Sequence, residues 1–250
     1  MRVRCWKAFV PTDNAKLEPK AVRRMPKHEE RWRQIYRDRK YETRFPFDSV
    51  VSFTFRHAPK NVPRDQVKVL DLGCGLGNNL RFLAQAGFCA TGIDISPEAV
   101  GRADDALKAE GHLVTVLCCS CADLPFPSEH FDMIIDRGTM TTLPDPTFGQ
   151  AFDQIFRVLK PDGHFLFTPF ADIHSANELK FSVSEGLLEG IVDGHLGVRE
   201  RGLRFVSYND IRELFRIGWD LKSLLLVQAS EMVRPNRMVD AEWQVVAQKR

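Results

Sequence analysis

From residue 67 onward, short β-rich runs alternate with longer segments in which apolar residues recur at helical spacing. This alternation is typical of a parallel sheet whose two faces are covered by helices. The runs predict strands at 67–72, 89–93, 113–118, 131–136 and 164–169. The segments between them predict helices at 78–86, 97–110 and 148–159. The second helix has the clearest start, because Ser96 can cap it and Pro97 suits its first turn.

The pattern changes after residue 170. Residues 171–205 are rich in glycine and charge and show no clear strand, so we interpret them as an insertion. A helix capped by Ser207 follows, and then β-rich runs at 221–227 and 243–247, which predict an antiparallel hairpin at the sheet edge. The whole pattern predicts an α/β fold with a doubly wound, Rossmann-like sheet of seven strands, mostly parallel and closed by this hairpin.

The domain organisation follows from the same pattern. We expect residues 1–60 to form a helical lid for the substrate, with a helix at 27–40 and a helical or extended run up to His57. Residues 61–250 would form the main domain, with a lid insertion at about 171–206. No apolar stretch approaches the roughly 20 residues that cross a bilayer, and the first residues lack a secretory leader, so we expect a soluble, cytoplasmic protein.

Charge is distributed unevenly along the chain. Residues 1–60 hold 16 Lys and Arg against 7 Asp and Glu, although the net charge of the whole chain is only +2. A basic arm can hold nucleic acid or an anionic substrate, but no aromatic-interleaved RNA-binding pattern accompanies it. We therefore expect a small-molecule substrate, no nucleic-acid or membrane partner, and a monomer or homodimer.

Five of the six cysteines lie in or beside predicted core strands, where reduced thiols pack as small apolar groups. We expect these five to be free: Cys74, Cys89, Cys118, Cys119 and Cys121. The run from Cys118 to Cys121 lacks a second ligand pair at zinc-like spacing. No metal site is therefore expected.

The first predicted strand ends in Asp71-Leu72-Gly73-Cys74-Gly75-Leu76-Gly77 and runs into a helix. Closely spaced glycines let the backbone approach a ligand, and free N–H groups at the helix start face it. A carboxylate at Asp71 would repel the pyrophosphate of a dinucleotide, and the glycine spacing differs from the G-x-G-x-x-G fingerprint. S-adenosylmethionine carries an ammonium and a sulfonium and no phosphate, so the acid favours this ligand.

Further motifs follow the next strands. Asp94 ends the second strand, 23 residues after Asp71, where a carboxylate can accept hydrogen bonds from both ribose hydroxyls. Asp123 follows the third strand and could accept from an adenine amino group, or it could simply cap a turn. The remaining motifs are Cys121-Ala122-Asp123-Leu124-Pro125-Phe126, Phe131-Asp132 and Val158-Leu159-Lys160-Pro161-Asp162-Gly163.

Together these motifs resemble the class I S-adenosylmethionine-dependent methyltransferases, in particular their small-molecule branch. The likeness covers about residues 67–169 in the family's motif order, with Asp162 where glycine is usual, at a turn that aspartate can also make. It implies S-adenosylmethionine as cofactor, S-adenosylhomocysteine as product and no metal. It implies cofactor contacts at Asp71, Gly73, Cys74, Gly75, Gly77, Asn78, Asp94, Ile95, Ser96, Ala122, Asp123, Leu124 and Asp136.

The candidate catalytic residues lie after the fourth and fifth strands. Asp136 and Arg137 would face the methionine end and the methyl acceptor, although Arg137 could instead pair with a surface acid. His174 is the candidate general base, with a core or surface histidine as the alternative. Trp32 and Tyr36 resemble the W-x-x-x-Y helix of several small-molecule methyltransferases, in which the tyrosine reaches the cofactor. A core stripe at i, i+4 explains this pair equally well.

The acceptor site is expected between the first 60 residues and the insertion, because ligands lie beyond the carboxyl ends of parallel strands. Arginines in both segments would suit an anionic acceptor: Arg31, Arg33, Arg44, Arg199, Arg201 and Arg204. The sequence thus predicts methyl transfer to a small molecule by in-line displacement. It leaves open a catalytically silent methyltransferase-like scaffold or regulator, and methylation of RNA or protein. A nicotinamide-dependent oxidoreductase would carry phosphate-friendly residues where Asp71 stands.

Overall fold

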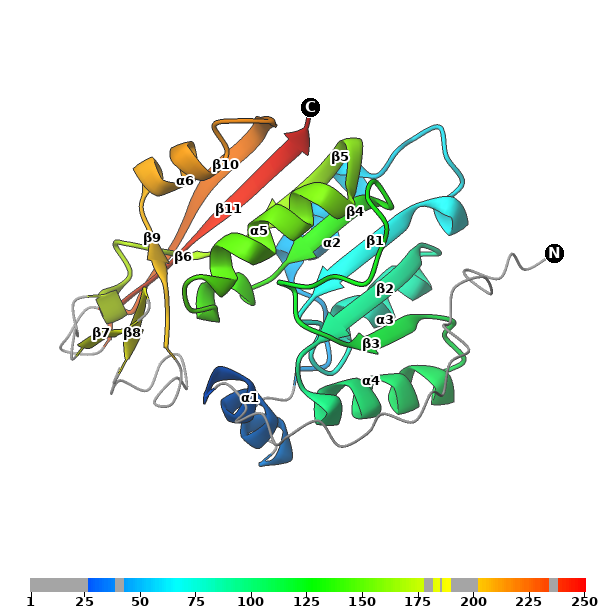
Figure 1. The fold of residues 1–250 in the computed structure, drawn as a ribbon, viewed down its shortest axis with the longest axis horizontal. Helices are drawn as coiled ribbons and strands as arrows, with labels where there is room; N and C mark the ends of the chain where they lie inside the picture. The colour runs from blue at the N-terminus through cyan, green and yellow to red at the C-terminus, as the bar shows by residue number, and fades with distance from the viewer. Residues whose placement is uncertain (1–26, 39–42, 178–181, 185, 190–201, 234–237) are drawn as a thin grey trace.

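The computed structural model describes residues 27–38, 43–177, 182–184, 186–189, 202–233 and 238–250. Strands and helices alternate along its centre, and a long hairpin closes the chain (Figure 1). The α-helices are α1 (Lys27–Arg37), α2 (Asp48–His57), α3 (Asn78–Gln85), α4 (Pro97–Ala109), α5 (Thr147–Val158) and α6 (Tyr208–Leu214). The strands are β1 (Lys68–Leu72), β2 (Cys89–Asp94), β3 (Thr115–Cys118), β4 (Phe131–Asp136), β5 (Leu159–Phe167), β6 (Phe170–Ala171), β7 (Ser182–Ser184), β8 (Leu187–Glu189), β9 (Phe205–Val206), β10 (Trp219–Ser230) and β11 (Val239–Lys249). Short 3-10 turns lie at Arg64–Gln66, Met140–Thr142 and Ser175–Asn177.

The main sheet has the strand order β3-β2-β1-β4-β5-β11-β6-β9, and β10 pairs with β11. The first five strands in this order are mutually parallel, whereas β11 runs antiparallel to both β5 and β10. The predicted fold class, a doubly wound Rossmann-like sheet with an antiparallel hairpin, is confirmed. The described sheet has nine strands instead of seven, because the two-residue strands β6 and β9 extend it.

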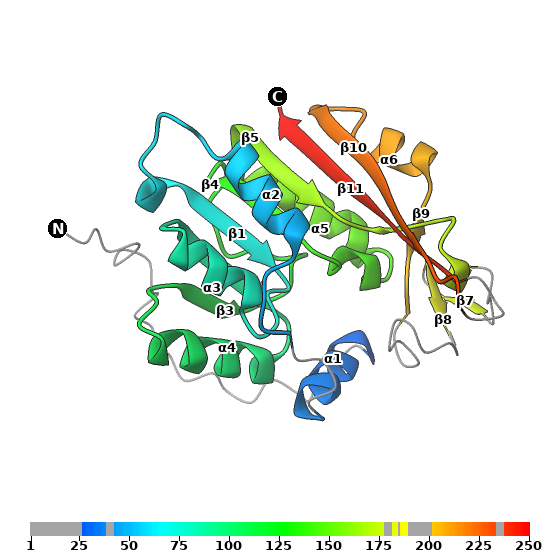
Figure 2. The same ribbon diagram turned by 180° about the vertical axis from the view of Figure 1, so that it is seen from behind.

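Each face of the sheet buries its own apolar cluster, since successive side chains of a strand point to opposite faces. Leu70 and Leu72 pack with α5 on one face, while Val69 packs with α2 and α3 on the other. Figure 1 shows α5 in front of the sheet, and Figure 2 shows α2 and α3 in front of the opposite face. Covering helices on both faces explain why β1 and β4 are buried almost throughout.

Helix starts were predicted well and some strand limits less well. The side chain of Ser96 accepts a hydrogen bond from Ala99 N at the start of α4, and Ser207 forms a capping box at the start of α6. β5 begins at Leu159 and not at 164, because Leu159 already pairs with Phe131 of β4. The turn that interrupts the apolar pattern of the sequence comes after this first pair. The run before His57, left open between helix and extended chain, forms α2.

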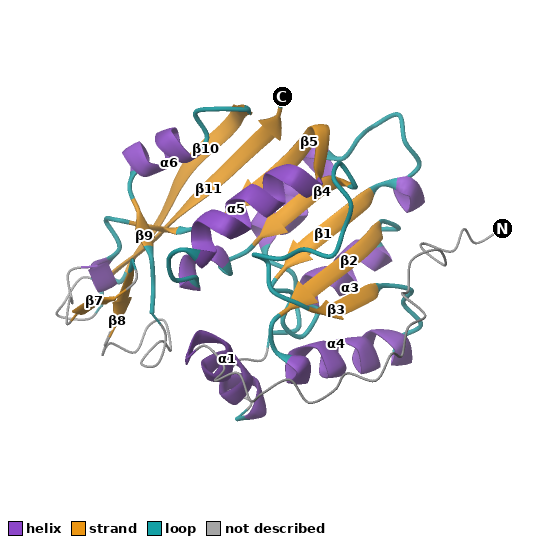
Figure 3. Ribbon diagram, viewed as in Figure 1, coloured by secondary structure: helices purple, strands orange, loops and turns teal. Residues whose placement is uncertain are grey.

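The expectation that residues 171–205 contain no strand is wrong. β7 and β8 form an antiparallel hairpin, and β9 pairs in parallel with β6. Figure 3 shows β7 and β8 set apart from the main sheet, on the side of β9. These strands are two or three residues long, which is too short to produce a readable alternation of apolar and polar positions.

The expectation that Cys89 is free is also wrong, because this residue is disulfide-bonded. It stands at the start of β2 and is only partly buried, so its sulfur is not sealed inside the core. Cys74, Cys118, Cys119 and Cys121 are free. Within the described ranges, no helix combines the length and apolar character that crossing a membrane requires. The same residues contain no group of three or more His, Cys, Asp or Glu that could hold a metal ion.

Candidate active site

The glycine turn after β1 is crowded by side chains from two other segments. Gly73 and Gly75 have φ angles of 62° and 53°, in the left-handed region. A Cβ at Gly73 would lie 2.0 Å from Thr139 Oγ1, and a Cβ at Gly75 would lie 2.7 Å from the Tyr36 hydroxyl. Both positions therefore require glycine for conformation and for space. The turn brings the end of β1, the loop after β4 and helix α1 to one point.

Three acids are buried at the carboxyl ends of neighbouring strands: Asp71 on β1, Asp94 on β2 and Asp136 on β4. Asp94 is held by backbone groups on both oxygens. Its Oδ2 accepts from Gly75 N at 3.0 Å, and its Oδ1 accepts from Ser96 N at 2.9 Å. These bonds join the end of β2 to the glycine turn, so Asp94 has one fixed position beside that turn.

Asp71 and Asp136 are each satisfied on one oxygen only. Asp136 Oδ1 accepts from Thr139 N at 3.1 Å and from Met140 N at 2.9 Å. Asp71 Oδ1 accepts from Asn79 Nδ2 at 3.3 Å. Among the described residues, the Oδ2 atoms of both acids have no hydrogen-bond partner although both are buried. A buried carboxylate oxygen without a partner is costly, and a donor or a positive charge would relieve that cost.

Burial also changes how these acids titrate. It raises the pKa of Asp71 to about 7, against the opposing effect of the hydrogen bond from Asn79. It likewise raises the pKa of Asp136 to about 7 and that of Asp94 to about 6, although backbone N–H donors oppose both shifts. A positive charge beside these groups would favour their ionised forms. The site is therefore suited electrostatically to a cationic ligand.

A cavity of about 320 Å³ opens beyond the strand ends. Its first wall comprises Gly73, Ile93, Asp94, Ile95, Cys119, Ser120, Cys121 and Ala122. Its second wall, from the loop after β4 to the first half of α5, comprises Thr139, Thr142, Leu143, Pro144, Thr147 and Gln150. Its third wall, from α1, comprises His28, Glu29, Trp32 and Tyr36. This is where ligands bind in open α/β sheets, and the volume is in the range of small-molecule sites.

A smaller cavity of about 40 Å³ adjoins the first at Tyr36 and Gly73, which line both. Its other described lining residues are Thr43, Phe47, Asp71, Cys74, Gly75, Leu76, Asn78, Asn79 and Arg137. It therefore places an acid, Asp71, and a cation, Arg137, in one small space. A ligand that carries both an ammonium and a carboxylate would match this pair of charges.

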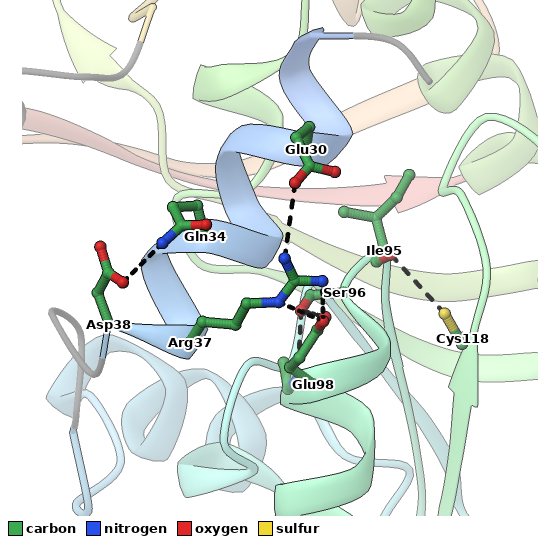
Figure 4. A network of polar contacts seen from close by, with 9 residues as sticks. Glu30, Gln34, Arg37, Asp38, Ile95, Ser96, Glu98 and Cys118 are labelled. Atoms are coloured by element: carbon green, nitrogen blue, oxygen red, sulfur yellow. Dashed lines mark hydrogen bonds and ion pairs between the residues drawn. The ribbon is translucent and has the colours of Figure 1, made fainter. Parts of the chain in front are cut away.

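Helix α1 is docked onto the start of α4, beside the first wall. The rings of Trp32 and Tyr36 stack with their centroids 5.9 Å apart. Arg37 Nη2 lies 2.7 Å from Glu98 Oε1, and Arg102 Nη1 donates to the Tyr36 carbonyl at 3.2 Å. Figure 4 shows Arg37 reaching from α1 to Glu98 at the start of α4. These contacts hold Tyr36 over the glycine turn.

Residues 69–163 match a family model described as a methyltransferase domain. An uncharacterized methyltransferase of Synechocystis sp. is 33% identical over 114 residues, which cover 46% of this chain and 50% of that protein. The glycine/sarcosine/dimethylglycine N-methyltransferase of Actinopolyspora halophila is 34% identical over 119 residues, which cover 46% of this chain and 21% of that protein. Residues 69–163 of the chain therefore correspond to a methyltransferase domain.

Solved structures share the fold of this methyltransferase domain. A SAM-dependent methyltransferase from Methanosarcina mazei has a TM-score of 0.62 at 21% identity, over 82% of this chain and 98% of that one. A Burkholderia thailandensis 1,6-didemethyltoxoflavin-N1-methyltransferase, bound to 1,6-didemethyltoxoflavin and S-adenosylhomocysteine, has a TM-score of 0.62 at 19% identity, over 89% and 87% of the two chains. The chain spans half or less of the length of the first curated relatives that it matches.

Most of the residues predicted to bind the cofactor of this methyltransferase domain line one of the two cavities: Tyr36, Asp71, Gly73, Cys74, Gly75, Asn78, Asp94, Ile95 and Ala122. Gly77 instead shapes the start of α3, and Ser96 supports Asp94. Asp123 is exposed, and its N–H donates to the Ser120 carbonyl in a turn, while Leu124 is buried in the core. Neither of these two is among the described lining residues, so their adenine contacts stay predictions.

The two residues after β4 have different surroundings. Asp136 is fully buried and is not among the described lining residues of either cavity, so its predicted contacts stay predictions. Its backbone partners hold the loop that forms the second wall. The Arg137 guanidinium lies 4.2 Å from the centre of the Phe47 ring, and Arg137 Nη2 lies 2.9 Å from Glu242 Oε2. Arg137 thus lines the smaller cavity and also pairs with an acid on β11.

The structure does not bring His174 to either cavity as described. Its Nδ1 accepts from Ala176 N at 3.0 Å, and its Nε2 lies 3.2 Å from Asp240 Oδ1. The ring is buried and packs against Phe170 and Phe205. Among the described residues Nε2 makes no hydrogen bond, and the bond to Nδ1 and the ring packing fit the core-histidine alternative. The role of base stays a prediction without support from position.

Sequence reasoning missed His28 and the polar groups of the second wall. Trp32 Nε1 donates to His28 Nε2 at 3.2 Å, and burial followed by the charge of Arg31 lowers the pKa of His28 to about 4. A signal for the wall was present in the hydroxyl-rich run Thr139-Met140-Thr141-Thr142, directly after the fourth strand. The signal for His28 was weaker: this residue stands four positions before Trp32 on the predicted helix.

The arginines proposed for an anionic acceptor do not gather at the larger cavity. Of the described ones, Arg31, Arg33, Arg44 and Arg204 are all absent from its lining. Arg204 is instead paired with Asp145 at 2.9 Å. The remaining two, Arg199 and Arg201, lie outside the described residues.

Proposed function

We propose that this protein transfers the methyl group of S-adenosylmethionine to a small-molecule acceptor by in-line displacement. When bound, the cofactor supplies a methyl group on a positively charged sulfur that is already activated as a leaving group. One observation carries the proposal: buried acids lie around the glycine turn, and Asp71, which lines the smaller cavity, keeps an oxygen without a partner among the described residues. Such an oxygen suits a ligand with positive charges and no phosphate.

Different residues of the two cavities would hold different parts of this cofactor. Asp71 and Arg137, in the smaller cavity, would hold its ammonium and its carboxylate. Asp94, in the larger cavity, would accept hydrogen bonds from the ribose hydroxyls. Ile95 and Ala122 would pack against the adenine, with Asp123 and Leu124 as further predicted contacts.

The acceptor would lie against the second wall. Thr142, Thr147 and Gln150 offer hydrogen bonds without charge, and Leu143 and Pro144 offer apolar surface. The described lining of the cavity contains no arginine, so we favour an uncharged acceptor over the anionic one that the arginine-rich segments suggested. The chain's contribution to rate would be alignment of the two reactants, which can account for a large part of the catalysis of a displacement.

An acceptor hydroxyl would need help with its proton, whereas a neutral amine would not. His28 is the described histidine that lines the larger cavity. Because Trp32 donates to its Nε2, a neutral His28 carries its proton on Nδ1. In that form His28 can orient an acceptor by donating a hydrogen bond but cannot take its proton, so we propose it for testing as an orienting residue and not as the general base.

Calorimetry tests the cofactor assignment directly. We expect heat with S-adenosylmethionine and S-adenosylhomocysteine and none with a nicotinamide dinucleotide. Asp71→Asn should weaken S-adenosylhomocysteine binding by about tenfold or more, because it removes a buried charge. The exposed Asp105→Asn on α4 is the matched control and should bind like the wild type.

Label transfer tests the reaction. The protein is incubated with methyl-labelled S-adenosylmethionine and a metabolite extract, and labelled products are identified by mass. A labelled small molecule that is absent with Asp71→Asn supports the proposal. Cofactor binding without any labelled product would favour a regulatory or scaffold protein, and absence of cofactor binding would refute the proposal.

A further inference from the structure

Arg204 lies where the insertion meets the loop after β4. Its backbone N–H donates a hydrogen bond to that loop, and its backbone carbonyl accepts one from it. Arg204 N donates to the Thr141 carbonyl at 2.7 Å. Thr141 Oγ1 donates to the Arg204 carbonyl at 2.7 Å. These two bonds, one from the Arg204 backbone N–H and one from the Thr141 side-chain hydroxyl, fix the position of residue 141, directly before the wall residue Thr142. These bonds attach the insertion to the second wall of the larger cavity, which is 63 residues away in the chain.

The side chain of Arg204 continues the attachment along the same loop. Its Nη2 donates to Asp145 Oδ1 at 2.9 Å and to the Leu143 carbonyl at 3.4 Å. The guanidinium also lies 4.4 Å from the centre of the Phe148 ring. An arginine that is committed to an acid, a carbonyl and an aromatic ring is poorly placed to bind a separate anion.

The β7–β8 hairpin rests on this ion pair through its turn. Gly186, at φ 75°, is so close that an added Cβ would lie 2.3 Å from Asp145 Oδ2 and 2.6 Å from Arg204 Nη2. The neighbouring Leu187 is buried, and its side chain lies against Gly202, where an added Cβ would meet it at 2.8 Å. The hairpin is therefore seated on the pair of charges that holds the loop.

The loop held in this way supplies much of the second wall of the larger cavity. Thr142, Leu143, Pro144 and Thr147 line the cavity, and the contacts of Arg204 lie among and beside them at Thr141, Leu143, Asp145 and Phe148. We name Arg204, these four contact residues and Gly186 the Arg204 cluster. No member of the cluster except Leu143 is itself among the described lining residues.

We propose that Arg204 is a positioning residue for the methyl acceptor: it fixes the second wall and makes the β7–β8 hairpin a determinant of acceptor specificity. This inference rests on the proposed methyl transfer. Loosening a wall that contacts the acceptor weakens acceptor binding in the ground state and the transition state alike, which raises KM more than it lowers kcat. In the cofactor half of the site, Asp71 and Asp94 are held independently of the Arg204 cluster, because their hydrogen bonds come from Asn79, Gly75 and Ser96, which lie outside the loop after β4.

Two measurements test the inference without knowledge of the acceptor. They are hydrogen–deuterium exchange of the loop and calorimetry of S-adenosylhomocysteine binding. Two variants loosen the cluster in different ways: Arg204→Gln removes the charge, and Gly186→Ala pushes the hairpin turn off the ion pair. We expect exchange in residues 141–148 to accelerate by about tenfold or more in both. We expect S-adenosylhomocysteine affinity to stay within about twofold of wild type. Arg212→Gln, the same change at an exposed position of α6, should leave both quantities unchanged.

A panel of small amines, phenols, thiols and carboxylates with labelled S-adenosylmethionine provides the second readout. For each compound that the wild type methylates, we expect Arg204→Gln to raise KM by about tenfold with a smaller change in kcat, and Arg204→Lys to recover part of the loss. Unchanged exchange in residues 141–148, or a loss of cofactor affinity as large as the loss of acceptor affinity, would overturn the inference. Failure of the wild type to bind S-adenosylhomocysteine would instead refute the proposed function.

Discussion

The cofactor half and the acceptor half of this site are built in different ways. In the cofactor half, Asp71, Asp94 and Asp136 stand at neighbouring strand ends, and their hydrogen bonds come from backbone groups or one nearby amide. In the acceptor half, α1, the loop after β4 and the insertion meet through contacts such as Arg204 with Asp145, 59 residues apart. Backbone geometry thus fixes the first half, and long-range packing fixes the second.

The largest effect is expected from Gly73→Ala, which changes the backbone conformation and the packing at the glycine turn of the cofactor half. The new Cβ would overlap Thr139 Oγ1, and alanine disfavours the φ of 62°. We expect a loss of about 2–4 kcal/mol in the free energy of unfolding and about 100-fold weaker S-adenosylhomocysteine binding. Thermal unfolding and calorimetry measure the two quantities.

The control for Gly73→Ala is Gly101→Ala on α4. An added Cβ at Gly101 meets no atom within 4 Å of the described structure, so this change should be neutral or stabilising by about 0.5–1 kcal/mol. The double variant Gly73→Ala/Thr139→Ala removes the two closest contacts but keeps the Thr139 Cβ at 2.9 Å and the strained φ, so it should recover part of the loss. Wild-type binding by Gly73→Ala alone would show that the turn is not tightly constrained.

The next largest effect is expected from Asp94. Asp94→Ala removes the acceptor for Gly75 N and Ser96 N together with the predicted ribose contact. We expect S-adenosylhomocysteine binding to weaken by about 100-fold, because two buried N–H groups lose a charged partner. Asp94→Asn keeps one acceptor oxygen and should lose less. Equal losses in the two variants would mean that the charge, and not the hydrogen bonds, carries the effect.

The same contrast explains what the sequence could and could not predict. The glycine turn and the acids that end β1 and β2 are local features, so Gly73, Gly75, Asp71 and Asp94 could be placed from the chain alone. Tyr36 lies beside the glycine turn and lines the larger cavity, but its predicted contact with the cofactor, which the sequence did not separate from a core stripe, stays a prediction.

Contacts between distant segments left no trace in the sequence pattern. β6 and β9 are two residues each and pair across the insertion, so no periodicity reports them. Arg204 looked like a free cation because its partner Asp145 stands in another loop. His174 looked like a base because it leaves the fifth strand, but its ring packs between Phe170 and Phe205. Side-chain direction in irregular segments depends on the folded neighbours and not on spacing.

A smaller effect, about tenfold in cofactor affinity, is expected from pH. Rising pH should lower the stability of the ligand-free protein and raise its affinity for S-adenosylmethionine. Burial raises the pKa of Asp71 and Asp136 to about 7 and that of Asp94 to about 6. The folded, ligand-free protein therefore keeps protons that the unfolded chain releases above about pH 4, so its stability falls as pH rises from about 5 to about 8. A cationic ligand favours the ionised acids, so S-adenosylmethionine affinity should rise by about tenfold over the same range.

Thermal unfolding of the free protein and calorimetry of the complex measure these opposite trends. Calorimetry in buffers with different heats of ionisation should show proton release on binding near pH 6. Asp71→Asn removes one of the titrating acids and should flatten both curves. An affinity for S-adenosylmethionine that is independent of pH would mean that the acids are already ionised in the free protein.

The smallest effect is expected from Arg37→Gln, at the exposed ion pair that joins α1 to Glu98. Exposed ion pairs contribute little, because water and salt screen them, so cofactor affinity should fall by less than about threefold and the difference should vanish at high salt. The stack of Trp32 on Tyr36 and the bond from Arg102 to the Tyr36 carbonyl keep α1 in place without Arg37. If Arg37→Gln instead weakened S-adenosylhomocysteine binding as much as Gly73→Ala, the docking of α1 would control the cofactor half. Long-range packing would then govern both halves of the site, and the contrast between them would not hold.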